Sequence, residues 1–108
     1  MSFQPNSLIK TTPISFSNAG DNIIVTAVPG QLIEVWQLYF VVNGATNITF
    51  KDGSNNALSG ALPMLANGAL TFDYTGLLWF TTTSASNNFI INSSSAVQIS
   101  GQIYYTQS

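Results

Sequence analysis

Four carboxylate side chains are the residues of this chain best suited to acid–base chemistry: Asp21, Glu34, Asp52 and Asp73. A glycosidase-type mechanism needs two of them on either side of a sugar bond. Asp21 and Asp52 lie in stretches of turn composition, where a carboxylate ordinarily accepts hydrogen bonds from nearby backbone N–H groups. Glu34 shares a predicted strand face with apolar residues, so we expect it to be half-buried beside a backbone or hydroxyl donor. We therefore predict no catalytic residues and no enzymatic activity.

The 108 residues include neither histidine nor cysteine. Their absence removes the Ser-His and Cys-His nucleophiles, the usual zinc ligand sets and any disulfide framework. Asp52, Ser54 and Asn56 place oxygen-bearing side chains at alternate positions, as the start of an EF-hand calcium loop does. Ala57 and Pro63 stand where such a loop needs glycine and glutamate, so the segment instead predicts a hairpin turn. We expect no metal site and no cofactor.

Charged residues are scarce, at 6% of the chain with a net charge of −2, against about 25% in ordinary soluble domains. Lys10 and Lys51 are the two cations, too few to neutralise a run of phosphates, so we expect no nucleic-acid partner. No basic amphipathic stretch and no long apolar run is present, so we expect no membrane binding. The N-terminus lacks the basic and apolar segments of a signal peptide, which predicts synthesis in the cytoplasm of the producing cell.

Aromatic rings flanked by Asn and Gln amides are what a sugar-binding platform needs. Trp79 and Tyr104 are the candidates for such a ligand or partner surface, and Tyr104 falls on the polar face of its predicted strand. Packing in the core or at an interface is the alternative, because aromatic residues are usually buried in a sandwich. A glycan is the ligand that this alternative to packing implies.

Hydrophobic residues recur with a period close to two, which is typical of strands. Turn sequences rich in Asn, Gly, Asp and Ser separate these segments about every 8 to 12 residues. The predicted strands are residues 8–17, 22–28, 31–42, 45–51, 69–74, 77–82, 87–92 and 96–106. Residues 58–66 are interrupted by Pro63 and predict a loop or a broken edge strand. The pattern indicates an all-β fold, an antiparallel β-sandwich of about eight strands.

Residues 31–42 differ from the other predicted strands because strict alternation makes both of their faces apolar. One face would carry Leu32, Trp36, Leu38, Phe40 and Val42. The other would carry Ile33, Val35, Tyr39 and Val41. A sandwich covers one face of each strand, so the second face needs another cover, and an identical chain is the simplest one. We predict a subunit interface formed by this second face, with a loop of the same chain, such as residues 58–66, as the alternative cover.

The length supports a single domain. Pro5 and Pro13 predict an N-terminal arm or edge strand over residues 1–20, because proline cannot donate a hydrogen bond to a sheet. The β-sandwich domain is predicted to span residues 21–108.

Several segments together resemble a family of small β-rich virion proteins of tailed bacteriophages. They are residues 21–25 (DNIIV), 29–31 (PGQ), 47–53 (NITFKDG), 58–60 (LSG), 78–80 (LWF), 88–92 (NFIIN) and 97–105 (VQISGQIYY). The resemblance lies in the order and spacing of these strand and turn segments, covers most of the chain from residue 21, and includes no catalytic motif. It implies a jelly-roll-like sandwich that assembles as a trimer on a capsid or within a fibre. The first twenty residues do not share it.

The resulting hypothesis is a structural, non-enzymatic virion protein. We expect a homotrimer that decorates the capsid surface and cements it by binding the major capsid protein, with the N-terminal arm and a polar rim making several weak contacts at once. The alternative is a receptor-binding or carbohydrate-binding module of a phage fibre or tail.

Overall fold

The computed structural model describes residues 9–53 and 55–108. These residues form strands joined by turns and loops. The strands are β1 (Lys10–Phe16), β2 (Gly20–Val25), β3 (Ile33–Val42), β4 (Thr46–Asp52), β5 (Asn56–Ala57), β6 (Leu62–Met64), β7 (Ala69–Phe72), β8 (Phe80–Thr81), β9 (Phe89–Ser93) and β10 (Ile99–Gln107).

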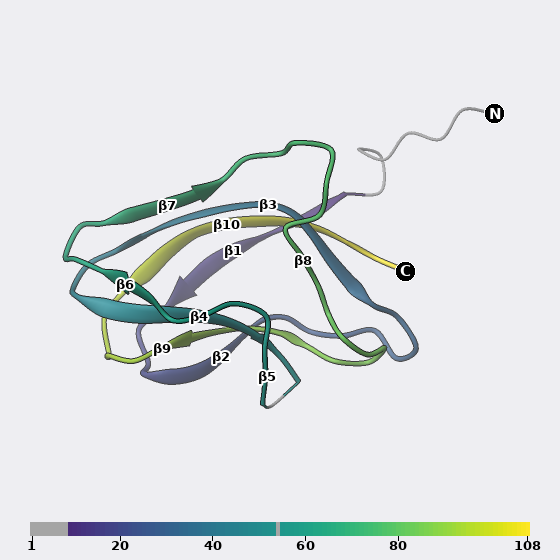
Figure 1. Cartoon of the computed structure of the whole chain (residues 1–108), viewed down its shortest axis with the longest axis horizontal. Helices are drawn as coiled ribbons and strands as arrows, with labels where there is room; N and C mark the ends of the chain where they lie inside the picture. Colours follow the sequence, from purple (N-terminus) through teal and green to yellow (C-terminus); the bar gives the residue numbers. More distant parts are fainter. Residues whose placement is uncertain (1–8, 54) are drawn as a thin grey trace.

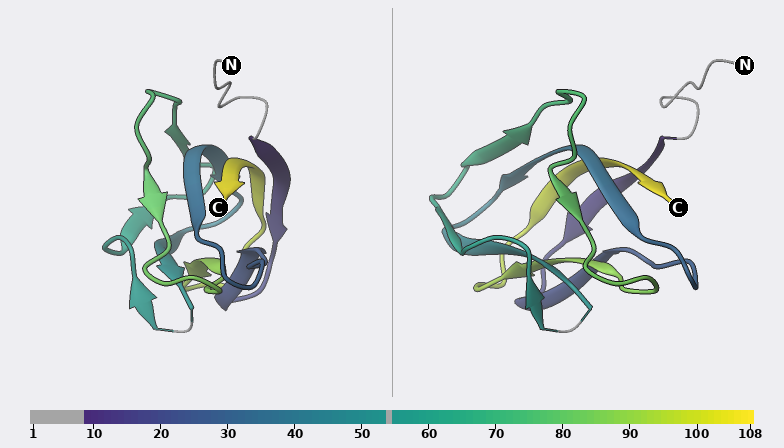
Figure 2. Two further views of the ribbon diagram at one scale, coloured as in Figure 1. Left: turned by 90° about the vertical axis from the view of Figure 1, so that its right-hand side faces the viewer. Right: turned by 45° about the vertical axis from the view of Figure 1, so that its right-hand side comes forward.

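The strands form two antiparallel sheets that pack face to face as a β-sandwich (Figures 1 and 2). One sheet, called here the β3 sheet, has the order β1-β10-β3-β7, with β8 also paired to β3. The other, the β4 sheet, has the order β2-β9-β4-β5, with β6 also paired to β4. The predicted all-β sandwich is confirmed. The described residues contain ten strands rather than about eight because β5 and β6 form short pairs along one edge of β4.

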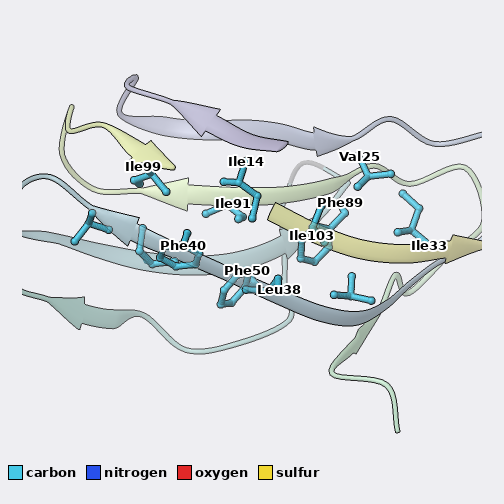
Figure 3. Packing of buried hydrophobic residues seen from close by; sticks show 13 residues of the cluster. Ile14, Val25, Ile33, Leu38, Phe40, Phe50, Phe89, Ile91, Ile99 and Ile103 are labelled. Atoms are coloured by element: carbon cyan, nitrogen blue, oxygen red, sulfur yellow. The ribbon is translucent and has the colours of Figure 1, made fainter. Parts of the chain in front are cut away.

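The core lies between the two sheets and is built from alternate residues of the long strands (Figure 3). In β4, Ile48 and Phe50 are fully buried whereas Asn47 is exposed, as the alternation of residues 45–51 predicts. In β10, Ile99 and Ile103 are buried and Ser100 is exposed. Strict alternation of this kind directs one side-chain set into the core and the other to the outer face.

β1 is the edge strand of the β3 sheet and pairs with β10 along its whole length. Its Ile14 is buried in the core, so the sandwich begins with this strand and not at residue 21. Pro13 is exposed at the edge, where the missing N–H leaves no hydrogen bond of the sheet unmade. Residues 1–8 of the predicted arm lie outside the described residues.

Of two segments with less regular sequences, one takes a predicted form and the other differs from its prediction. Residues 58–66 contain the short edge strand β6, which follows the broken-edge alternative. In residues 77–82, only Phe80 and Thr81 form a strand. The chain turns just before it at Gly76, whose φ of +87° lies in the left-handed region that glycine adopts without strain.

Candidate functional site

The outer face of the β3 sheet carries an uncommon set of large side chains. Tyr39 and Val41 of β3 are 41% and 50% exposed, while their neighbours Leu38, Phe40 and Val42 are buried. Half-buried Trp36 and Tyr104 continue this surface along β3 and β10. We call Trp36, Tyr39, Val41 and Tyr104 the aromatic face. It lies on the side of the β3 sheet away from the β4 sheet, so no second layer of the described sandwich covers it (Figure 2).

A β-bulge in β3 corrects the predicted subunit interface. Tyr104 pairs with Gln37 but Tyr105 pairs with Val35, so Trp36 is the extra residue. One extra residue exchanges the two faces of a strand on either side of it. Ile33 and Val35 consequently point into the core, where both are 0% exposed, and they cannot contact another subunit in this fold. Tyr39 and Val41 remain on the outer surface, as predicted.

Hydrogen bonds fix the bulged end of the aromatic face. The Trp36 indole Nε1 donates to Thr106 Oγ1 at 3.0 Å, and the Thr106 hydroxyl donates to Glu34 Oε1 at 3.1 Å. The Ser108 hydroxyl donates to the same Glu34 oxygen at 2.8 Å. Glu34 is therefore a part-buried acceptor for hydroxyl donors near a strand end, as the sequence predicts. The bonds orient the Trp36 ring on the outer surface.

The loop from β7 to β8 presents a second set of apolar side chains next to this face. Tyr74, Leu77, Leu78 and Trp79 are 50%, 75%, 38% and 41% exposed, and we call these four residues the apolar tip. The Tyr74 ring contacts Trp36, with ring centroids 6.0 Å apart. Trp79 is held more tightly, because its ring stacks on Phe72 at 4.6 Å and its indole Nε1 donates to the Asp73 carbonyl at 2.7 Å. The predicted surface residues Tyr104 and Trp79 thus belong to different parts of one surface, connected through Trp36 and Tyr74.

A hollow lies at the end of the aromatic face opposite the bulge. Its volume is about 320 Å³, and it is lined by Val41, Val42, Asn43, Asn67, Gln98 and Ser100. Three amide side chains and a hydroxyl therefore surround an aliphatic floor. Hydroxyl-rich ligands are bound by this combination of groups.

Asp52 is the carboxylate whose environment differs most from its prediction. It is 0% exposed at the end of β4. Its Oδ2 accepts hydrogen bonds from the backbone N–H and hydroxyl of Thr83 and from the Asn87 amide, all more than 30 residues away along the chain. Burial alone would raise the pKa of Asp52, but the hydrogen bonds from Thr83 and Asn87 outweigh it and lower the pKa below the ordinary value. The carboxylate joins β4 to the loop before β9, and its partners are not the local backbone donors that turn composition suggests.

Asp21 also departs from its predicted turn role, because it lies within β2. Its Oδ1 accepts a hydrogen bond from the Asn92 amide at 2.7 Å and forms an ion pair with Lys51 at 3.0 Å. The Asn92 hydrogen bond is the main cause that lowers the pKa of Asp21; burial opposes it, and the hydrogen bond and charge of Lys51 lower the pKa further. These residues connect three adjacent strands on the outer face of the β4 sheet.

No family model, curated protein or solved structure matches this chain. In residues 9–53 and 55–108, no helix has the length and apolar character needed to cross a membrane. Within the same ranges, no three carboxylate, histidine or cysteine side chains gather as metal ligands.

Proposed function

We propose that this protein is a non-enzymatic structural component of a bacteriophage virion, a homotrimer on the capsid surface that binds and cements the major capsid protein. The observation that carries the proposal is the aromatic face. Tyr39 and Val41 are large side chains exposed at the centre of a sheet, and contiguous exposed apolar surface of this kind marks interaction sites. Tyr and Trp are also the residues most enriched in the buried centres of protein interfaces.

The connectivity supports the jelly-roll part of the proposal. From β1 to β4, consecutive strands alternate between the two sheets, and the last two strands, β9 and β10, return beside the first two. A double-sheet jelly roll combines two Greek keys in this way. The resemblance to small virion proteins supports the trimer and the capsid as its partner.

Light scattering at several protein concentrations tests the assembly. We expect a concentration-independent trimer, and we expect the double variant Tyr39→Ser and Val41→Ser to have the mass of a monomer, because the polar hydroxyls remove apolar surface from the contact. Ile23→Ser is the matched control, since Ile23 is 58% exposed on β2 of the other sheet. Co-sedimentation with shells of the major capsid protein then tests the partner. A monomeric parent protein that does not sediment with shells would exclude this function.

A second candidate function, carbohydrate binding by a fibre or tail module, is favoured by the amide-lined hollow beside Val41. A sugar stacked on Tyr39 would extend its hydroxyls toward Asn43 and Asn67. Titration against a panel of glycans tests this candidate. Saturable binding that is lost in Tyr39→Ala and Asn67→Ala would support it, and silence across the panel would count against it.

A further inference from the structure

Two apolar features of opposite shape lie on either side of β7. The apolar tip follows β7 and presents Leu77 and Leu78 to solvent. A groove precedes it, between β6 and β7, lined by residues 62–65 and 68–70, with a volume of about 430 Å³. We call it the apolar groove. Leu65 at its rim is 80% exposed, which is unusual for a leucine with an apolar hollow beside it.

The tip of a chain does not reach its own groove. The groove lies where β6 turns into β7, at the left end of the molecule in Figure 1, and the loop that carries the tip lies beyond the other end of β7. Within residues 9–53 and 55–108, no segment covers Leu77 of the tip or Leu65 of the groove, which are 75% and 80% exposed.

We propose that the apolar tip of one copy of this chain binds in the apolar groove of the next copy. The groove is lined by apolar residues and carries no charge. Outside the groove, Leu77 is the most exposed large apolar side chain of the described residues, at 75%, and Leu78 beside it is 38% exposed. A cavity of about 150 Å³ holds a benzene molecule, so a groove of this volume has room for both leucines. A second copy of the chain is therefore the occupant whose chemistry fits.

Contacts at both ends of the tip hold it in place. Its two rings are anchored, Tyr74 against Trp36 and Trp79 against Phe72, and the Trp79 backbone N–H donates to the Val35 carbonyl at 2.9 Å. Between these anchored residues, Leu77 projects outward at 75% exposure, and Leu78 is partly exposed at 38%. A preorganised loop loses little conformational freedom on binding, which favours association.

The proposed contact is continuous with the aromatic face. Tyr74 joins the tip to one end of that face through Trp36. At the other end, Ala69 lines the groove and is paired with Val41 across the sheet. Tip, face and groove therefore form one strip. A contact between two different patches is heterologous and closes into a ring when the rotation between copies allows it. The inference rests on the proposed self-assembly and assigns the residues that carry it.

Opposite or like charges introduced into the tip and the groove provide the test. The variants are Leu77→Glu, Leu65→Lys, the double variant that combines them, and a second double variant, Leu77→Lys with Leu65→Lys. Both positions are at least 75% exposed, so the fold is expected to tolerate every change, which circular dichroism verifies. Ile23→Lys on the β4 sheet controls for adding charge to an exposed apolar site. Mass is measured by light scattering at low salt.

We expect each single variant to fall to one third of the parent mass, because it buries an unpaired charge in the contact. The Glu/Lys double variant should regain the parent mass, because its opposite charges pair across the contact. The Lys/Lys double variant should stay at the lower mass, because its like charges repel. An oligomeric parent whose mass is unchanged by Leu77→Glu, or a Glu/Lys variant that stays monomeric, would overturn the tip-to-groove contact alone. A monomeric parent would overturn the proposed assembly itself.

Discussion

Replacing Phe50 by alanine tests whether one side chain joins the two sheets. Phe50 belongs to β4 and is 0% exposed. Its ring centroid lies 4.7 to 6.3 Å from four other rings, those of Phe40, Phe72, Phe80 and Phe89. The first three of these rings belong to strands of the β3 sheet. Truncating Phe50 therefore opens a cavity at the centre of the contact between the sheets.

The expected loss is large in comparison with the stability of such a domain. Removing a buried phenylalanine costs about 3–5 kcal/mol of the free energy of unfolding, and a small domain has roughly 5–15 kcal/mol in total. An unfolding entropy of about 2.1 cal/mol/K per residue amounts to roughly 0.23 kcal/mol/K for this length. The melting temperature of Phe50→Ala should then fall by roughly 13–22 °C. Phe50→Leu keeps most of the volume and should cost about 1.5 kcal/mol or less.

Thermal unfolding followed by tryptophan fluorescence measures both variants. All samples are compared at one protein concentration, because the proposed self-association would make stability depend on concentration. Ile23→Ala truncates an exposed side chain and serves as the control, with an expected change within about 0.5 kcal/mol. A Phe50→Ala protein that melts within a few degrees of its parent would refute the assignment of Phe50 as the residue that holds the sheets together.

Two further predictions concern Asp52 and Gly101. The pKa of Asp52 is lower in the folded chain than its ordinary 3.8, so as pH falls the unfolded chain binds the proton at a higher pH than the folded chain does. The stabilisation that ionised Asp52 gives to the folded state is therefore complete above pH 3.8 and is lost as pH drops through the folded pKa. Urea unfolding between pH 7 and pH 2 measures this, and the free energy of unfolding of Asp52→Asn should fall less steeply with decreasing pH than that of the parent. An equal pH dependence of the two proteins would contradict the prediction. In Gly101→Ala, the new Cβ would overlap the backbone carbonyl of Tyr39, which should cost at least about 1–3 kcal/mol. The control Gly60→Ala places its Cβ in open space, and equal melting temperatures of the two variants would refute the clash.

The period-two pattern predicts the buried residues well where one alternation of apolar and polar residues holds along the whole strand. In β4 and β10 the same alternation holds along the strand, so their buried residues follow from the sequence. β3 does not, because the extra residue at Trp36 exchanges its faces halfway. A bulge depends on pairing with β10, and the β3 residues alone carry no signal for it. The prediction that Ile33 and Val35 lie at an interface fails for this reason.

The candidate site was predictable in part. Tyr39, Val41 and Tyr104 follow from counting apolar and aromatic residues on strand faces. The apolar tip could not be predicted in this way, because Leu77, Leu78 and Trp79 have the composition of a buried strand. Their place in a loop becomes clear only from the turn at Gly76 and the contacts of Trp79 in the structure. The hydrogen-bond partners of Asp52 could not be predicted, because Thr83 and Asn87 are distant in the sequence and only the fold brings them next to the carboxylate.

The bulge at Trp36 accounts for both the core and the surface of this sandwich. It turns Ile33 and Val35 inward, where they extend the core beyond the point that strict alternation would allow. The same exchange of faces turns Trp36 outward, where its ring meets Tyr74 and joins the aromatic face to the apolar tip. Without the extra residue, the tip would be separated from that face and the core would lose two of its buried side chains. One local irregularity thus extends the core and makes the exposed surface continuous, which agrees with the proposed self-assembly.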